Sequence, residues 1–469
     1  MKFCSITLGC KVNQYETQAM EEILLSRGHT LAIPGAGCDV CIINTCAVTS
    51  ESSRKSGQAV RRMKKSEPDA LIAVCGCLSQ IDSGLADQLN ADIVGGSGNR
   101  HRFVNEIEKL YLKKMSGSYD AILPGNGSET REDRDSAMEQ RLTGGQNDSE
   151  LRCLPLDTIF EELPPGSAAG RTRALLKIQD GCDNYCAYCV IPYARGRARS
   201  LPESRAVEFA GRLEQQGYRE IVITGIEIAS YGKDISATSS LERVIQMIAE
   251  TAKSARIRLS SLDPGFVTGE FCDAMSAIPN LCNHFHLSLQ SGCDDTLLRM
   301  GRKYDAKAAG EAISMLRRQF INCGITSDLI TGFPGETDSD FERTMEFITE
   351  AEFSGMHIFP FSPRPGTRAA EMPGQVPKSV RSERAYRASR KAKEMADAFK
   401  HKQVGKKAGV LFERERAGAL FGHTENYVEV AVAANGRGGG QMASGVRRNT
   451  VHSVQISGVI NGIVWAEII

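Results

Sequence analysis

Apolar and polar residues alternate along the first hundred residues in a way that predicts strands followed by amphipathic helices. Apolar runs predict strands at residues 3–8, 39–44 and 70–74, and a short fourth at 92–94. Helical patterns lie between them, over about residues 13–28, 50–65 and 79–89. Such alternation is typical of an α/β fold, so we expect an N-terminal doubly wound parallel sheet. Asn13 is the expected N-cap of the first helix, with Glu16 completing a capping box.

The same alternation resumes at residue 173 and runs for about 200 residues. Six further strands are expected at residues 174–178, 220–224, 257–260, 284–289, 326–330 and 355–359. Helical patterns separate most of them, for example over 204–216 and 306–320, which predicts a central partial (β/α)6 barrel. The last sixty residues lose the helical period and alternate, as in YVEVAVA, which predicts a small antiparallel β-barrel.

Two charged segments interrupt these patterns. Residues 116–165 carry eleven acidic and four basic residues, a local charge of −7, without apolar periodicity, so we expect a flexible acidic linker. Residues 378–407 predict a basic helix, with eleven Lys or Arg and three Asp or Glu, a local charge of +8. The expected segments are an N-terminal domain, a linker, a central domain and a C-terminal barrel, over residues 1–115, 116–167, 168–400 and 401–469.

Composition refines this multidomain picture. The chain has 469 residues, about three domains at roughly 150 residues each. Its 57 basic and 57 acidic residues give a net charge of zero, but this sum over unlike segments does not exclude a nucleic-acid partner. Fifteen cysteines, an odd number in a long chain, favour reduced thiols or metal ligands over a disulfide framework. With no apolar run of ~18 residues and no signal-peptide pattern, we expect a cytoplasmic protein without a membrane partner.

The segment GCDNYCAYCVIPYARG carries the strongest chemical signal. It places Cys182, Cys186 and Cys189 at C-x3-C-x2-C spacing, and the next cysteine along the chain is Cys272. Iron–sulfur clusters usually take four cysteines, so three would leave one iron open to a cofactor or substrate. Tyr188 adds an aromatic face that suits an adenine. A structural zinc site or chance clustering is the alternative.

This segment resembles the cluster loop of the radical S-adenosylmethionine superfamily, whose C-x3-C-x-aromatic-C pattern it reproduces. The resemblance implies a [4Fe–4S] cluster that binds S-adenosylmethionine and, after one-electron reduction, yields a 5′-deoxyadenosyl radical. Gly225 and Glu227 in ITGIEIASYGKD resemble the superfamily's cofactor-contacting turn, although Glu227 equally suits a helix cap. Further expected cofactor contacts lie at strand ends or in the cluster loop: Tyr188, Ser260, Gln290 and Asp328.

A second set of cysteines is spread over the N-terminal domain. Cys10, Cys46 and Cys77 each follow the end of a predicted parallel strand. Because such ends lie along one edge of a sheet, the three thiols are candidates for a second cluster with an open iron. The alternative is that small apolar thiols fill the strand ends. Cys75 lies two residues before Cys77, so the spacing alone does not decide which of these two cysteines is the third ligand.

The two cysteine triads together resemble the methylthiotransferases. The segments that carry this resemblance are TLGCKVNQYET, NTCAVT, GCLSQ, ALLKIQDGCDNYCAYCVIPYARG, HLSLQSG, DLITGFPGET and FSPRPGT. The family pattern V-x-G-C assigns the third auxiliary ligand to Cys77. The resemblance covers almost all of the chain except the acidic linker, and implies an N-terminal cluster domain, a radical S-adenosylmethionine domain and a TRAM-like β-barrel.

The form TLGCKVNQYE is most similar to the branch that acts on N6-threonylcarbamoyladenosine at position 37 of tRNA. This implies two [4Fe–4S] clusters, S-adenosylmethionine, an electron donor such as flavodoxin or ferredoxin, and no catalytic side chain beyond the clusters. We expect a monomer that binds the anticodon loop. The alternatives are isopentenyladenosine in tRNA or a ribosomal-protein aspartate as substrate, and, in another class, a non-catalytic iron–sulfur RNA-binding or sensor protein.

RNA contacts are expected from positive charge and aromatic rings. The segment FGHTENYVEV resembles the TRAM signature, and such small barrels bind RNA through stacking and phosphate contacts. A solvated charged surface is the alternative. The expected RNA-binding residues lie in PYARGRARS, in this segment and near residue 447: Arg195, Arg197, Arg199, Phe421, Tyr427, Arg447 and Arg448.

Overall fold

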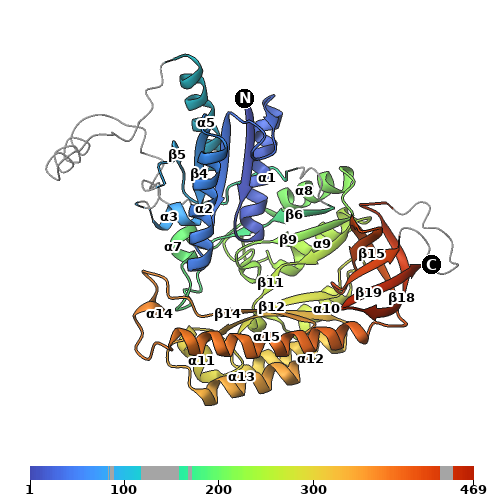
Figure 1. Cartoon of the computed structure of the whole chain (residues 1–469). Coiled ribbons are helices and arrows are strands. Elements are labelled where there is room, and N and C mark those ends of the chain that lie inside the picture. Colours follow the sequence, from blue (N-terminus) through green and yellow to red (C-terminus); the bar gives the residue numbers. More distant parts are fainter. Residues whose placement is uncertain (83, 85–88, 118–157, 167–171, 434–446) are drawn as a thin grey trace. The chain divides into compact units, whose positions relative to one another are not determined.

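The computed structural model describes residues 1–82, 84, 89–117, 158–166, 172–433 and 447–469 (Figure 1). Contacts divide the chain into two compact units. The first comprises Met1–Gly9, Ile23–Ala47 and Glu51–Asp157; the second comprises Cys10–Glu22, Val48–Ser50 and Thr158–Ile469. Most of the expected acidic linker lies outside the described residues. The four predicted segment boundaries therefore stay predictions.

The first unit contains a five-stranded parallel sheet in the order β2-β1-β3-β4-β5, which confirms the predicted parallel sheet. Its strands are β1 (Lys2–Thr7), β2 (Thr30–Leu31), β3 (Val40–Thr45), β4 (Leu71–Gly76) and β5 (Ile93–Val94). The helices that follow β3, β4 and β5 are α2 (Ser50–Ser66), α3 (Cys77–Ile81) and α5 (Arg100–Met115). The sequence patterns miss β2 and α5. Of the helix expected over 79–89, α3 covers the first residues, and 85–88 lie outside the described part.

Helix α1 (Lys11–Ser26) passes from the second unit into the first and corrects one prediction. It begins at Lys11, so Asn13 and Glu16 lie inside the helix instead of at its first cap position. Both side chains are buried, and both accept hydrogen bonds from Arg195. The two polar side chains that the sequence pattern assigns to the helix end thus bind the buried guanidinium of Arg195 instead.

The second unit contains two open parallel sheets, in the orders β10-β9-β6 and β11-β12-β13-β14. The bounds are β6 (Arg173–Lys177), β9 (Glu220–Thr224), β10 (Arg256–Leu259), β11 (Ser261–Leu262), β12 (His284–Gln290), β13 (Gly324–Thr331) and β14 (Gly355–Pro360). The six predicted strands are thus found within two residues of their expected ends. The single partial barrel that would join both sheets stays a prediction. A short antiparallel pair, β7 (Gln179–Asp180) and β8 (Arg199–Ser200), flanks the cysteine loop.

Helices lie between these strands, and most follow the predicted pattern. They are α7 (Ile191–Arg195), α8 (Glu203–Gln215), α9 (Leu241–Thr251), α10 (Gly269–Ser276), α11 (Asp294–Met300), α12 (Ala306–Gln319), α13 (Asp338–Ala351), α14 (Arg368–Glu371) and α15 (Lys378–His401). Helices α12, α13 and α15 cover one face of the β12–β14 sheet (Figure 1). Phe285, Leu287 and Leu289 point to this face, where they share a hydrophobic core with Leu316 and Ala388.

The C-terminal strands form a closed barrel in the order β15-β16-β17-β19-β18. The strands are β15 (Lys407–Arg416), β16 (Ala419–His423), β17 (Glu429–Ala433), β18 (Val451–Ile460) and β19 (Ile463–Ile468). Every neighbouring pair is antiparallel except β17 and β19, which run parallel. Val410, Phe412 and Val454 belong to its hydrophobic core. No helix of the described chain has the length and apolar character needed to cross a bilayer.

Candidate functional site

The cysteine loop lies between β7 and α7 and brings three thiols together within eight residues. The Cys182 N–H donates to the Gly196 carbonyl at 3.0 Å, which closes the loop at its base. Within it, the Cys189 N–H donates to the Cys186 carbonyl at 3.0 Å. Cys182, Cys186 and Cys189 are all half-buried. This is a set of soft ligands, of the kind that holds iron–sulfur clusters or zinc.

Each of the three sulfur atoms has an N–H donor nearby. The backbone N–H groups of Asn184 and Ile191 lie 3.5 and 3.4 Å from the Sγ atoms of Cys182 and Cys189, and Arg302 Nη1 lies 3.4 Å from Cys186 Sγ. Burial raises the pKa of Cys182 to about 11 and that of Cys189 to about 12. The thiols of Cys182 and Cys189 are thus protonated at neutral pH, and a bound metal would displace their protons.

Glycines before Cys77 and Cys182 let the chain turn where no side chain fits. Gly181 has a φ of +69°, and a Cβ there would lie 1.9 Å from the Arg197 carbonyl oxygen. Gly76 has a φ of +110°, and a Cβ would lie 2.4 Å from the Thr45 carbonyl oxygen. Glycine is therefore needed before each of these cysteines, because another backbone segment approaches too closely for any side chain.

Two predicted cofactor residues, Glu227 and Ser260, have buried oxygen atoms without a partner in the described structure: Glu227 Oε1 and Ser260 Oγ. The other Glu227 oxygen accepts a hydrogen bond from Asn184 Nδ2, inside the cysteine loop, at 3.3 Å. Burial, aided by the charge of Asp263, raises the pKa of Glu227 to about 7. Unpartnered buried oxygens are costly, so they indicate that a polar ligand completes this site. They fit a cofactor that carries amino and hydroxyl groups, as S-adenosylmethionine does.

Gly225 has a local role that the sequence reading does not include. A Cβ at Gly225 would lie 2.9 Å from atoms of Gln179 and of Ile228. The Gln179 side-chain oxygen accepts from the Glu227 N–H at 2.8 Å, and its amide nitrogen donates to the Gly181 carbonyl at 2.8 Å. Gln179 therefore ties the Gly225 turn to the start of the cysteine loop.

Arg302 joins the cysteine loop to the strand ends of the second parallel sheet. Besides Cys186 Sγ, its guanidinium contacts Asp263 Oδ2 at 2.8 Å and the Ser288 carbonyl at 3.1 Å. Sequence reasoning does not find this residue, because a lone arginine after a helix carries no pattern. Gln290, at the end of β12, takes a left-handed φ of 67° at a register shift in the strand.

The remaining two predicted cofactor residues are engaged by protein groups. Tyr188 packs edge-on against Phe333, with ring centroids 6.4 Å apart, in a small hydrophobic cluster. The carboxylate of Asp328 is held by His286 and His357. Contact of either residue with the cofactor stays a prediction.

The N-terminal cysteines are divided between the two units. Cys46 and Cys77 follow directly after β3 and β4, neighbouring strands in which Thr45 pairs with Gly76. Cys10 is exposed and belongs to the second unit, near the start of α1. Cys75 is fully buried within β4. The placement of Cys46 and Cys77 agrees with the strand-end pattern, and the second cluster stays a prediction.

A buried ionic network beside the loop changes the reading of two arginines. Asp180 Oδ2 contacts Lys177 Nζ at 2.7 Å and Arg199 Nη2 at 3.1 Å, and Glu16 Oε1 contacts Lys177 Nζ at 2.8 Å and Arg195 Nη1 at 2.7 Å. Arg195 and Arg199 are 0% and 4% exposed. The prediction that they contact RNA is wrong, because their guanidinium groups lie in the interior and pair with these carboxylates.

The other predicted RNA contacts differ in accessibility. Arg197 is exposed, with Asp183 as its ion-pair partner, and Arg447 and Arg448 are exposed beside β18. The Phe421 ring is half-buried, and the Arg414 guanidinium lies 5.9 Å from its centroid.

Tyr427 is the exception among the predicted RNA-stacking rings. It stacks on His284 and on His423, with centroid distances of 4.7 and 4.8 Å, and Arg173 donates to its hydroxyl at 3.1 Å. These contacts join the barrel to β12 and β6. The Tyr427 ring therefore has a structural role in holding the barrel against the parallel sheets, and its contact with RNA stays a prediction.

Comparisons with known proteins find two family models and several relatives. The model of the radical SAM superfamily matches residues 176–348, and that of the uncharacterized protein family UPF0004 matches residues 2–96. The threonylcarbamoyladenosine tRNA methylthiotransferase MtaB of Thermotoga maritima is 36% identical, over 92% of this chain and 91% of the relative. MtaB of Bacillus subtilis is 34% identical, over 90% and 88%. The tRNA-2-methylthio-N(6)-dimethylallyladenosine synthase of Pelotomaculum thermopropionicum is 30% identical, over 90% and 89%.

Among solved structures, the radical S-adenosylmethionine methyltransferase TsrM of Kitasatospora setae matches with a TM-score of 0.53. The match covers 79% of this chain and 74% of TsrM at 12% identity, a likeness of fold alone.

Proposed function

The chain belongs to the radical S-adenosylmethionine methylthiotransferase family, and we propose that it converts N6-threonylcarbamoyladenosine at position 37 of tRNA to its 2-methylthio derivative. The cysteine loop, with the Glu227 carboxylate that accepts from its Asn184 and keeps one oxygen unpartnered, is the observation that carries the chemistry. The choice of nucleoside is supported by relatives named for threonylcarbamoyladenosine at 36% and 34% identity, against 30% for a relative named for dimethylallyladenosine.

The family implies S-adenosylmethionine and a [4Fe–4S] cluster, which Cys182, Cys186 and Cys189 would hold. When bound, the pair supplies a 5′-deoxyadenosyl radical that takes hydrogen from an unactivated carbon. Glu227 and Ser260 would accept hydrogen bonds from the amino or hydroxyl groups of S-adenosylmethionine. Arg302 would hold the side of the loop at Cys186 in place through Asp263 and the Ser288 carbonyl.

A second cluster would be held by Cys10, Cys46 and Cys77 and would bind or donate the sulfur. Cys46 and Cys77 support this role because they follow neighbouring parallel strands, where ligands commonly bind in α/β sheets. A one-electron donor such as flavodoxin or ferredoxin would reduce the first cluster.

The tRNA would be bound by the exposed basic groups Arg197, Arg447 and Arg448, and by the half-buried ring of Phe421. A base in an anticodon loop is less firmly stacked than one in a duplex, so it can be turned into a protein pocket at lower cost. No protein general base is needed for the hydrogen abstraction itself.

The test is mass spectrometry of tRNA nucleosides from a deletion strain that carries plasmid-borne variants. The deletion should lose 2-methylthio-N6-threonylcarbamoyladenosine, and the unaltered gene should restore it. A variant with Cys182, Cys186 and Cys189 replaced by Ala should not restore it, whereas Cys272→Ala, in α10, should. Loss of the dimethylallyladenosine derivative instead would assign the chain to the other tRNA branch.

A further inference from the structure

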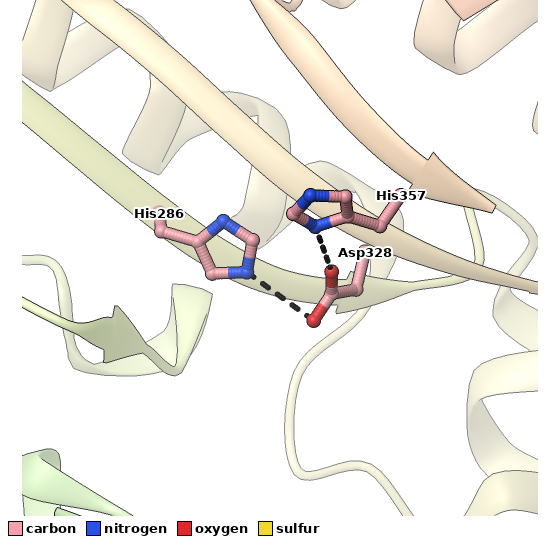
Figure 2. Close-up of side chains that lie close together, drawn as sticks. All are labelled: His286, Asp328 and His357. Carbon is pink, nitrogen blue, oxygen red and sulfur yellow. Dashed lines mark hydrogen bonds and ion pairs between the residues drawn. The ribbon is translucent and has the colours of Figure 1, made fainter. Parts of the chain in front are cut away.

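Two histidines share one carboxylate on three neighbouring strands of the second parallel sheet (Figure 2). His286 on β12 places Nε2 3.2 Å from Asp328 Oδ2, and His357 on β14 places Nδ1 3.1 Å from Asp328 Oδ1. Asp328 lies on β13, the strand between them, in register with His357. Three strands therefore fix the relative positions of the three side chains.

The two histidines differ in what they offer to a ligand. The second ring nitrogen of His286, Nδ1, lies 2.9 Å from Thr326 Oγ1, so both nitrogens of this ring have partners. The His357 side chain is 72% exposed and uses only Nδ1, toward Asp328. Pairing with Asp328 raises the pKa of His357, which favours the form that carries an N–H on Nε2. In that protonated form, His357 Nε2 offers an N–H to a ligand.

The face that carries these residues runs toward the cysteine loop. Along β12, His286, Ser288 and Gln290 are half-exposed and alternate with leucines that pack in the core. The Ser288 carbonyl accepts from Arg302, whose guanidinium contacts Cys186 Sγ. Ser288 follows His286 by two residues, a rise of about 7 Å along a strand. A ligand on this face therefore lies within reach of both the histidines and the cluster loop.

The charges around the triad favour an anion over a cation. Lys11 interacts electrostatically with Asp328 and with His357, and burial together with Arg173 and Arg258 lowers its own pKa. Those two arginines are paired with Glu413 and Glu220. Burial and the charge of Arg258 lower the pKa of the neighbouring His284, which keeps that ring neutral. One carboxylate, already shared by two imidazoles, thus faces one ammonium group, that of Lys11, which acts on both Asp328 and His357. A divalent cation would have to bind against this positive group.

We propose that His286, Asp328 and His357 form the receptor for the anionic substituent of the substrate base, with His357 Nε2 donating to its carboxylate. This inference rests on the proposed function, because the N6-threonylcarbamoyl group ends in a carboxylate whereas the isopentenyl group carries none. Asp328 and His286 are positioning residues, which hold the His357 ring and its charge. The site then selects between two nucleosides that share the same reacting carbon.

The test compares two anticodon stem–loops, one with N6-threonylcarbamoyladenosine and one in which its carboxylate is replaced by a carboxamide. With the reconstituted enzyme, the carboxamide should lower kcat/KM for methylthiolation about ten- to hundredfold, the size of a charge-assisted hydrogen bond. His357→Gln should lower kcat/KM for the carboxylate substrate by a similar factor and leave the two substrates nearly equal. His401→Gln, at the end of α15, is the matched control and should keep the discrimination.

Other outcomes would overturn the inference in distinguishable ways. Equal use of both substrates by the unaltered enzyme refutes the receptor, while absence of activity on either, with S-adenosylmethionine cleavage intact, refutes the proposed function instead. If His357→Gln weakens binding equally for both substrates and for a stem–loop with unmodified adenosine, the triad binds an RNA phosphate. If the variant loses one equivalent of zinc or another divalent metal with its iron content unchanged, the triad is a cation site.

Discussion

At the scale of single residues, Asp180 is a carboxylate that three buried cations share. It contacts Lys177, Arg195 and Arg199, all nearly inaccessible to solvent. Burial by itself would raise the pKa of Asp180, but the three positive charges outweigh it and hold the pKa well below its usual range. An unfolded aspartate titrates near pH ~4, so these pairs stabilise the fold above that pH, and the contribution is lost as the pH falls further.

Asp180→Asn should therefore lower the free energy of unfolding at pH 7 by about 3–5 kcal/mol, because it leaves three buried cations short of a partner. Urea unfolding followed by circular dichroism measures this change. The difference in free energy of unfolding between the variant and the unaltered protein should narrow below pH ~4, because the unfolded aspartate takes up a proton there while folded Asp180 stays ionised. Glu51→Gln, which removes an exposed partner of Arg54, is the control and should leave the urea midpoint unchanged. Equal midpoints for both variants would contradict the assignment.

Glu227→Gln and Ser260→Ala test whether the two unpartnered oxygens bind the cofactor. Each variant should weaken the binding of S-adenosylmethionine about tenfold, the effect of one lost hydrogen bond of ~1.4 kcal/mol. Equilibrium binding to the reconstituted protein measures this affinity, and the iron content should not change. Glu250→Gln, on the exposed side of α9, is the control. Undiminished affinity in both variants would show that these oxygens serve another group.

At the scale of elements, the sequence predicts strands better than helix starts. Six strands of the second unit follow from apolar runs such as EIVIT, since a buried parallel strand needs apolar residues on both faces. The two-residue strands β7, β8 and β11 are too short to give such a run and are not predicted. The cap assigned to Asn13 failed because its oxygen accepts from Arg195, 182 positions away along the chain. The sequence pattern assigns Arg195 to a basic surface because its buried partners, Asn13 and Glu16, are also distant along the chain. Local patterns cannot encode partners that only the fold brings together.

In the C-terminal barrel, the residues proposed to contact RNA differ from those that make structural contacts, which gives a prediction for this element. Arg447→Ala with Arg448→Ala should reduce the slope of log affinity for tRNA against log salt concentration by about two, with no change in Tm. Tyr427→Ala should lower Tm instead, because its ring stacks on His284 and His423. Fluorescence anisotropy from ~50 to ~200 mM salt and thermal unfolding measure the two effects. An unchanged salt slope in the arginine variant would remove these residues from the RNA site.

At the scale of the whole molecule, zero net charge conceals segments of opposite sign. Two of the positive charges on α15 are paired with acids outside the helix: Arg384 contacts Glu336 and Asp338, and Arg387 contacts Glu342. The +8 of residues 378–407 therefore overstates the charge that this helix presents to a partner. The cysteine spacing predicted the candidate cluster loop, since all three ligands lie within eight residues. Arg302 and the His286–Asp328–His357 triad could not be predicted in this way, because their partners come from different strands.

The chain as a whole is proposed to hold two clusters, and cysteine variants can remove one cluster while leaving the other in place. Cys46→Ala combined with Cys77→Ala should reduce the iron content of the reconstituted protein from about eight to about four atoms per chain. The variant should still cleave S-adenosylmethionine to 5′-deoxyadenosine, since Cys182, Cys186 and Cys189 remain, but it should form no methylthio product. Cys75→Ala is the matched control, because its thiol is buried within β4 and should not bind iron. If the double variant kept about eight iron atoms while Cys75→Ala lost four, the second cluster would use Cys75, and the ligand assignment taken from the V-x-G-C pattern would be wrong.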